Sequence, residues 1–280
     1  MSTTTTPLEA GSFVSAAGIN THFHEAGDGP PLLMLHGSGP GVSAWANWQR
    51  AIEPLSRTSR VLALDIVGFG QTERPADIRY SLRSWTDHVW AFLDAVGVEK
   101  ASIVGNSLGG RIALQMAEDD PARLDRLILM GSPGVGMTLT PGLRALREYE
   151  PSYAAMKTLL KTYFAVDPAL ITDELVKIRY EASAEPGAHD SYRMMFFDPR
   201  HAGSELSITE EQVRAVRNPT LLVHGREDQV VPLEVSLNML RLIPHADLHV
   251  FSQCGHWTQI ERADEFNRVV ADYLRGESHA

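Results

Sequence analysis

A serine flanked by two glycines is the first candidate for chemistry in this chain. It lies in Gly105-Asn106-Ser107-Leu108-Gly109, which matches the pattern G-x-S-x-G, after an apolar run (101–104) and before a helical pattern (111–116). A sharp turn from strand to helix lifts such a serine above the sheet, at a helix N-terminus that favours negative charge. Flanking glycines let the strand and the helix approach closely. The sequence therefore predicts that Ser107 is a catalytic nucleophile.

A serine hydroxyl needs a general base, and the base needs a third group to orient it. Two candidates follow later apolar runs: Asp228 comes after 220–224, and His256 comes after 248–251. The order serine, acid, histidine is the one expected for a serine on this kind of turn. Glu227 is an alternative acid, but Asp228 lies one residue further round the turn and is preferred.

Other histidines also lie near apolar runs. We interpret them as core residues or as residues that support the catalytic ones; they are His36, His224 and His249. Only His256 combines a position after a strand with a neighbouring glycine, so it is the predicted base.

Charge that develops on a carbonyl oxygen during attack requires hydrogen-bond donors. The N–H of Leu108, directly after the nucleophile, is the first candidate. The second is the N–H of Ser38 in the glycine-rich loop 36–41, which follows the run 31–35. A phosphate-binding loop is the alternative interpretation of this loop, but the Gly-Lys-Ser/Thr ending and the G-x-G-x-x-G spacing are both missing.

Short apolar runs alternate with amphipathic segments, as in a mostly parallel sheet covered by helices. Helical spacing recurs over 82–96 and 266–273, and Gly97 marks the end of the first helix. The segment up to about Glu25 is predicted to form an antiparallel hairpin at the sheet edge, which completes an eight-stranded sheet. The predicted strands after it are 31–35, 61–65, 101–105, 127–130, 220–224 and 248–251.

One stretch, 134–203, contains no convincing strand. Helical patterns cover 143–149, 153–164 and 171–183, with proline and glycine between them. We predict a helical lid, inserted between strands 6 and 7, over a core formed by 1–133 and 204–280. The alternative is that these helices are ordinary crossovers of the sheet.

Composition restricts the class of protein. The chain has 280 residues, of which 44% are hydrophobic, enough for one large core or two small ones. The longest apolar runs are too short to span a membrane, and the threonine-rich start (1–10) does not resemble a secretion signal. The single cysteine, Cys254, fits a reducing cytoplasm. A net charge of −10 without a basic cluster argues against a nucleic acid partner.

Several motifs together make the chain resemble the α/β-hydrolase fold family and, within it, the meta-cleavage-product hydrolases. The likeness runs from about Gly18 to Leu274 and is strongest to hydrolases of 2-hydroxymuconic semialdehyde. The segments that carry it are 36–48 (HGSGPGVSAWANW), 105–109 (GNSLG), 179–183 (RYEAS), 224–232 (HGREDQVVP) and 254–261 (CGHWTQIE).

The resemblance implies a set of substrate-binding residues. Arg179 would meet the substrate carboxylate in a bidentate contact that lysine would not reproduce. Asn47 and Asn106 would donate to the same end, and Trp257 would exclude water. Arg179 as a helix-surface charge and Asn106 as a turn residue are the alternative readings. The expected substrate-binding residues are Gly37, Gly39, Asn47, Asn106, Arg179 and Trp257.

The resemblance also implies a reaction. A 2-hydroxy-6-oxo-hexa-2,4-dienoate would be ketonised, attacked at C6 by Ser107 and cleaved to 2-hydroxypenta-2,4-dienoate and a carboxylic acid. No metal or cofactor is expected, and the protein is expected to form a homo-oligomer. A carboxylesterase, or a non-catalytic receptor on the same scaffold, remains an alternative.

Two features stay open at this level. The C6 substituent is not determined, although lid residues are expected to wall its pocket; candidates are Tyr153, Met156, Phe164 and Met195. Arg111 stands where the family is expected to have a small residue. It either begins the helix on the solvent side or adds a second cation to the pocket.

Overall fold

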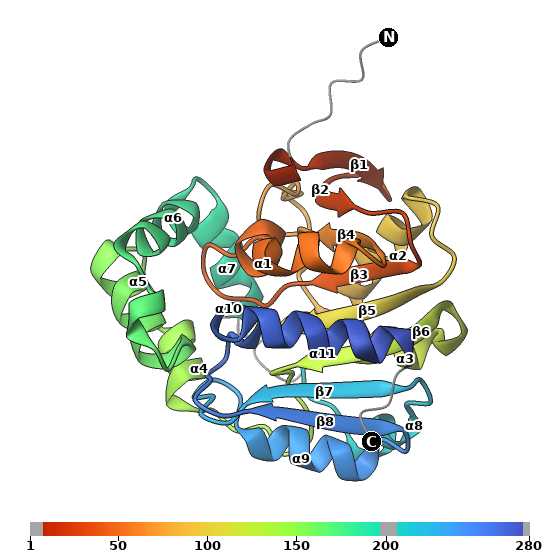
Figure 1. Cartoon of the computed structure of the whole chain (residues 1–280). Helices are drawn as coiled ribbons and strands as arrows, with labels where there is room; N and C mark the ends of the chain where they lie inside the picture. Colours follow the sequence, from red (N-terminus) through yellow and green to blue (C-terminus); the bar gives the residue numbers. More distant parts are fainter. Residues whose placement is uncertain (1–7, 197–205, 277–280) are drawn as a thin grey trace.

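The computed structural model describes residues 8–196 and 206–276. Within these residues, eight strands form one sheet in the order β1-β2-β4-β3-β5-β6-β7-β8 (Figure 1). Pairing is antiparallel for β1 with β2 and for β2 with β4, and parallel elsewhere. The strands are β1 (Ser12–Ala16), β2 (Ile19–Ala26), β3 (Pro31–Leu35), β4 (Arg60–Leu64), β5 (Ala101–Asn106), β6 (Leu124–Met130), β7 (Thr220–Gly225) and β8 (Ala246–Phe251).

The predicted eight-stranded, mostly parallel sheet is confirmed, as is the N-terminal hairpin at its edge. Every residue of β5 and β7 is buried, because helices cover both faces of the central sheet. Their sequences are consequently continuous apolar runs rather than alternating ones. The edge strand β8 is only partly buried.

Helices cover the two faces of the sheet. One face carries α1 (Ala44–Ser56), α10 (Thr258–Glu261) and α11 (Ala263–Arg275), where the Trp48 and Phe266 rings stack at 6.3 Å. The opposite face carries α2 (Leu82–Ala95), α3 (Leu108–Asp119), α8 (Glu210–Ala215) and α9 (Leu233–Leu242). Gly97 follows α2 with φ +70°, a conformation that favours glycine. Short 3₁₀ turns occupy Leu8–Ala10, Pro121–Arg123 and Pro168–Leu170.

A helical insertion joins β6 to β7, and its helices lie beyond the carboxyl end of the sheet (Figure 1). The predicted helices 143–149, 153–164 and 171–183 correspond to the first three segments, and the fourth, α7, was not predicted. This helix follows Pro186-Gly187, and three of its first four residues are polar. The apolar spacing typical of a helix is therefore not visible in the sequence. The segments are α4 (Pro141–Arg147), α5 (Tyr153–Leu159) continued by a π-helical turn (Leu160–Phe164), α6 (Asp173–Ala184) and α7 (Ala188–Phe196). Positions 197–203 of the predicted lid lie outside the described residues.

A buried ion pair between His22 of β2 and Asp65, the residue after β4, also receives a hydrogen bond from the start of α1. Asp65 Oδ2 accepts from His22 Nδ1 (2.8 Å) and from Gln71 N–H (2.9 Å), and Oδ1 accepts from Ala44 N–H (2.5 Å). Burial raises the pKa of Asp65, but these donors and the nearby His36 reverse the shift and lower it. Burial lowers the pKa of His22, and the contact with Asp65 raises it above its ordinary value. Both pKa shifts favour the ionised form of the pair.

No helix in the described part of the chain is long and apolar enough to cross a membrane.

Candidate active site

Ser107 occupies a strained turn between β5 and α3. Its φ of 50° and ψ of −113° lie in a region that side-chain-bearing residues rarely adopt. The neighbouring glycines are required sterically. A Cβ at Gly105 would lie 2.6 Å from the Gly109 backbone, and one at Gly109 would lie 2.2 Å from the Leu35 carbonyl oxygen. The sequence pattern thus corresponds to the tight strand-to-helix turn that it predicts.

Asp228 and His256 meet at the carboxyl ends of β7 and β8. His256 Nδ1 lies 2.7 Å from Asp228 Oδ2. The second carboxylate oxygen, Oδ1, accepts from the N–H groups of Val230 (2.7 Å) and Val231 (2.9 Å). The backbone thus holds one carboxylate oxygen of Asp228, and the other oxygen faces the imidazole of His256.

Two histidines hold the Asp228 carboxylate ionised. Besides His256, His224 places Nε2 3.4 Å from Asp228 Oδ2. Burial alone raises the pKa of Asp228. The charge and hydrogen bonds of His256 and His224 outweigh that effect and hold the pKa well below its usual range. A permanent carboxylate favours the His256 tautomer that carries its proton on Nδ1, which leaves Nε2 free to accept one.

Glu227, the alternative acid, faces away from this pair. Its side chain pairs with Arg226 at 2.8 Å and accepts from Cys254 N–H at 3.1 Å. The structure therefore brings His256 together with Asp228 and not with Glu227.

Ser107 and His256 line the same small cavity, which we call the inner cavity; its volume is about 20 Å³. No hydrogen bond joins their side chains in the described part of the chain. Such bonds commonly tighten only when substrate is bound. The lining residues are Gly37, Ser38, Gly39, Val42, Asn47, Asn106, Ser107, Leu146, Phe164, Arg179, His256 and Trp257.

The loop after β3 is oriented by His36. Its Nδ1 donates to the Gly37 carbonyl at 2.6 Å, while its Nε2 accepts from Ile66 N–H at 3.1 Å. In a trans peptide the C=O and the following N–H point in opposite directions. The Gly37–His36 contact therefore turns the Ser38 N–H away from His36. Leu108 is the first residue of α3, so its N–H is among the donors that a helix leaves unpaired.

Two buried donors at the inner cavity have no partner. Asn47 Nδ2 and Arg179 Nε make no hydrogen bond with any described residue, although both atoms are inaccessible to solvent. Arg179 is only 3% exposed and has no carboxylate partner in the described part of the chain. Burial lowers the pKa of Arg179 to about 10, so it remains charged at neutral pH. Both donors line the inner cavity, so they are available to a carboxylate or carbonyl group of a ligand there.

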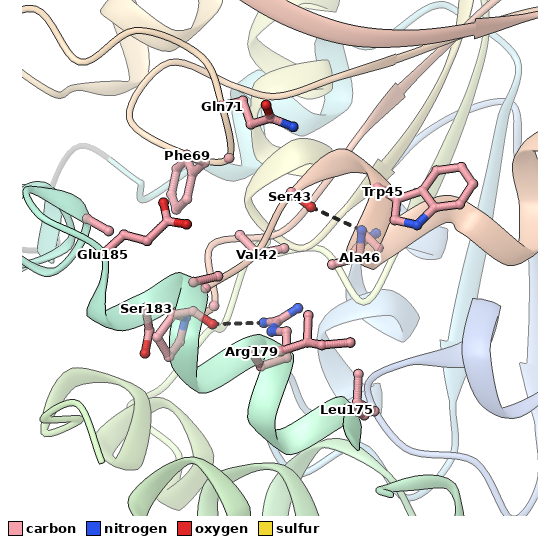
Figure 2. Close-up of a pocket in the computed structure, with 18 of the residues that line it drawn as sticks. Val42, Ser43, Trp45, Ala46, Phe69, Gln71, Leu175, Arg179, Ser183 and Glu185 are labelled. Carbon is pink, nitrogen blue, oxygen red and sulfur yellow. Dashed lines mark hydrogen bonds between the residues drawn. The ribbon is translucent and has the colours of Figure 1, made fainter. Parts of the chain in front are cut away.

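The Arg179 guanidinium is held in place by its neighbours. Nη2 donates to the Pro40 carbonyl at 3.0 Å, and the guanidinium lies 5.4 Å from the Trp257 ring. Figure 2 shows it reaching from α6 toward the loop that carries Val42 and Ser43. Arg179 is therefore not a helix-surface charge. Asn106 has a structural contact as well, because its Nδ2 donates to the Met130 carbonyl at 3.3 Å.

Of the insertion residues expected to wall the pocket, Phe164 lines the inner cavity. Its ring lies 5.6 Å from the His256 ring and 4.8 Å from the Trp257 ring. The other three lie elsewhere: Tyr153 is 37% exposed, Met156 is buried in the core, and Met195 packs against Gly68. The sequence missed Val42 and Leu146, because apolar wall positions carry no chemical signature.

A contact that the sequence did not reveal ties the insertion to the histidine loop. Glu261 accepts from Gly255 N–H through Oε1 and from Val166 N–H through Oε2, both at 2.7 Å. His256 N–H donates to the Phe164 carbonyl at 3.0 Å. Glu261 therefore joins the backbone beside His256 to the end of the π-helical turn. Its place in the motif 254–261 was the available signal.

Arg111 neither faces solvent nor lines the inner cavity. It is 2% exposed, and its Nε and Nη2 donate to the carbonyls of Leu206 and Ser207, each at 3.2 Å. The expectation of a solvent-side helix start is therefore wrong. The long side chain reaches from α3 to the segment that returns from the insertion.

The remaining histidines have structural contacts. His224 bonds Ser236 Oγ at 2.7 Å and the Val231 carbonyl at 2.9 Å, which positions it behind Asp228. His249 lies on β8 against Phe251, with ring centroids 4.4 Å apart. Among the described residues, no group of His, Cys, Asp and Glu side chains is arranged to hold a metal ion.

Comparisons with known proteins agree with this geometry. A family model described as the alpha/beta hydrolase fold matches residues 30–263. A 2-hydroxymuconate semialdehyde hydrolase from Pseudomonas sp. (strain CF600) is 50% identical over 95% of this chain and 94% of its own length. The chain belongs to the meta-cleavage-product hydrolases of the α/β-hydrolase fold.

Other members of the family support this assignment. A 2-hydroxy-6-oxo-2,4-heptadienoate hydrolase from Pseudomonas putida is 46% identical over 96% of this chain and 98% of its own length. The solved structure of a serine-to-alanine variant of a meta-cleavage product hydrolase from Pseudomonas fluorescens IP01, complexed with acetates, superposes with a TM-score of 0.92 at 47% identity. It covers 97% of this chain and all of the other.

Proposed function

We propose that this protein is a serine-dependent hydrolase that cleaves a carbon–carbon bond in 2-hydroxy-6-oxo-hexa-2,4-dienoate-type products of aromatic ring fission. The observation that carries the proposal is the pair of unpartnered buried donors, Asn47 Nδ2 and Arg179 Nε, at the cavity that also holds Ser107 and His256. An esterase needs the nucleophile and base. It does not need a buried, unpaired arginine beside them.

Five of the six expected binding residues have a stated role in this proposal. The Arg179 guanidinium and the Asn47 amide receive the carboxylate and the C2 oxygen of the substrate. Trp257 keeps the guanidinium in one orientation through its ring face. Gly37 and Gly39 leave room for the substrate, since a Cβ would lie 3.0 Å from Asn106 Oδ1 at the first and 3.1 Å from Arg179 Nη2 at the second.

Chemistry proceeds in three stages. Ketonisation of the dienol moves a proton to C5, with His256 as the proton carrier, and makes C5 a leaving carbon. Ser107 then attacks the C6 carbonyl while its proton passes to His256, and the N–H groups of Ser38 and Leu108 hold the oxyanion. Cleavage of C5–C6 releases 2-hydroxypenta-2,4-dienoate and leaves an acyl group on Ser107, which water hydrolyses to a carboxylic acid.

The C6 substituent in this proposal is hydrogen or methyl. Relatives at 50% and 46% identity are named for the semialdehyde and the heptadienoate, whereas a relative named for the 6-phenyl substrate is 37% identical. Phe164 and Leu146 narrow the cavity around Ser107, which favours a small group.

A comparison of chromogenic substrates tests the function. The yellow dienolates with hydrogen, methyl and phenyl at C6 are compared with p-nitrophenyl acetate under one set of conditions. We expect kcat/KM for the hydrogen or methyl dienolate to exceed that for the ester by at least about 100-fold, because only the dienolate carries a carboxylate for Arg179. Faster turnover of the ester would identify a carboxylesterase. Negligible turnover of all four would identify a binding protein.

The helices α4 to α7 form the lid in this proposal. The active protein is a cytoplasmic homo-oligomer, and it needs no metal or cofactor. The single, buried Cys254 is compatible with a reducing compartment. Light scattering after size-exclusion chromatography measures the oligomeric state, and a mass equal to 30.8 kDa would refute the oligomer.

A further inference from the structure

We propose that substrates reach Ser107 through a second, larger cleft between α6 and the core, with Arg179 at its floor. This outer cleft has a volume of about 630 Å³. Ile178 and Ala182 of α6 line this cleft. Figure 2 shows Leu175 of the same helix on one side and Val42 and Ala46 on the other. The inference rests on the proposed function, since it concerns how the same site is filled.

The two cavities differ greatly in size. The inner cavity, at about 20 Å³, has room for about one water molecule. The outer cleft, at about 630 Å³, falls in the range of cavities that bind small molecules. A six-carbon dienoate therefore fits the outer cleft before it fits the site around Ser107. It must pass from one to the other.

The two cavities meet at a shared wall. Gly39, Val42, Asn47 and Arg179 line both of them. The unpartnered donors Asn47 Nδ2 and Arg179 Nε thus lie at the boundary, where a carboxylate arriving from the outer cleft would meet them first. Gly39 has no side chain to block the passage.

The boundary is held by one hydrogen bond and by the Trp257 ring face, 5.4 Å from the Arg179 guanidinium. Among the described residues, one hydrogen bond, from Arg179 Nη2 to the Pro40 carbonyl, ties the guanidinium to the core loop. A substrate carboxylate can replace that bond with a charge-assisted one. The guanidinium can therefore bind the arriving anion in the orientation that the Trp257 ring gives it, without a net loss of hydrogen bonds.

Charge on the walls is balanced. Three arginines (Arg50, Arg74 and Arg179) and three glutamates (Glu9, Glu174 and Glu185) line the outer cleft. The glutamates are exposed at the rim, whereas Arg179 is buried at the floor. Long-range attraction is therefore small, and the width of the cleft controls access.

Blocking the cleft from either wall tests the proposal. Ala182→Trp fills it from α6, and Ala46→Trp fills it from α1. Glu181→Trp and Glu53→Trp are the matched controls, because they place the same indole on the same helices at exposed positions outside the cleft. All four are made in a Ser107→Ala background, and stopped-flow absorbance measures binding of the yellow dienolate without turnover.

We expect the association rate constant to fall at least about tenfold in Ala182→Trp and Ala46→Trp, with an equal fall in the dissociation rate constant. Kd then stays within about threefold of the parent, as it must when only the passage is narrowed. The controls stay within twofold in both rates. Circular dichroism identifies a variant that fails to fold. If one of the two cleft variants does so, the variant on the opposite wall still tests the proposal.

Two results would overturn the proposal. Unchanged association rates in both cleft variants would show that substrate arrives by another path. A raised Kd that comes from faster dissociation would make these positions part of the binding site instead of the passage. Absence of dienolate binding by the Ser107→Ala parent would instead refute the proposed function itself.

Discussion

The backbone N–H of His256 donates a hydrogen bond to the carbonyl oxygen of Phe164, the last residue of the π-helical turn, over 3.0 Å. The candidate base and the insertion that covers it are therefore joined directly. The Phe164 ring packs against the imidazole in the same contact. A displacement of this part of the insertion would move His256 as well, so a contact that fixes it should affect catalysis.

Glu261→Gln tests that connection. The amide of glutamine faces one of the two N–H groups that the carboxylate accepts, so either Gly255 or Val166 loses its partner, at a cost of about 1–3 kcal/mol. We expect kcat to fall about tenfold while KM changes less than threefold. Glu265→Gln, a half-exposed position on α11 away from the Gly255 and Val166 backbone, is the control and should be unaffected. Equal kcat values in the two variants would show that Glu261 does not position His256.

Ser107→Ala tests the nucleophile. Removal of the hydroxyl should lower kcat by at least about 10³-fold, because nucleophile and base act as a unit. Substrate should still bind, since the Arg179 and Asn47 donors remain. Single-turnover absorbance kinetics measure both quantities. Turnover at the wild-type rate would end the assignment of Ser107.

Arg179→Ala tests the carboxylate site. Loss of a buried charge-assisted contact should cost about 2–5 kcal/mol in kcat/KM for the dienolate, or about 30-fold to several thousand-fold. Arg179→Lys should recover little, because an ammonium lacks the planar fork of donors. Lys177→Ala on the exposed side of α6 is the control. An uncharged ester should be hydrolysed at a nearly unchanged rate by all three, and an equal loss there would indicate a folding defect.

Asp65→Asn tests the buried ion pair with His22. The lowered pKa of Asp65 stabilises the fold above pH 3.8, its ordinary value, and this stabilisation is lost as pH falls through the lower folded pKa. The raised pKa of His22 stabilises it below pH 6.5, and this is lost as pH rises through the higher folded pKa.

The free energy of unfolding should therefore differ most between about pH 4 and 6.5, by about 3–5 kcal/mol, and less on either side. Urea unfolding from pH 3 to 9 measures the difference, with the exposed Asp77→Asn as the control. A difference that does not vary with pH would contradict the ionised pair.

Much of the fold was predictable because its signals are local. Continuous apolar runs marked the parallel strands, and the glycines around Ser107 marked the turn between β5 and α3. The helix α7 was missed because its first turn is polar and follows Pro186-Gly187. Apolar residues therefore do not recur there at the three- to four-residue spacing of a helix. The insertion itself was recognisable from the absence of strands.

The candidate site was predictable where a residue type carries chemistry. Asp228 and His256 lie side by side although 28 positions separate them, and Arg179 and Asn47 lie at one cavity although they come from different parts of the fold. Contacts made through backbone atoms were not predictable. The bonds of Glu261 to Gly255 and Val166 depend on how two loops meet, and no single residue type signals that.

The positive φ of Ser107 has a consequence for how this chain could change. A left-handed backbone at a side-chain-bearing residue costs about 1–3 kcal/mol, and glycine would relieve it. Ser107→Gly should therefore raise the melting temperature while abolishing turnover. The stability of the fold therefore favours glycine at position 107, whereas the reaction requires serine there.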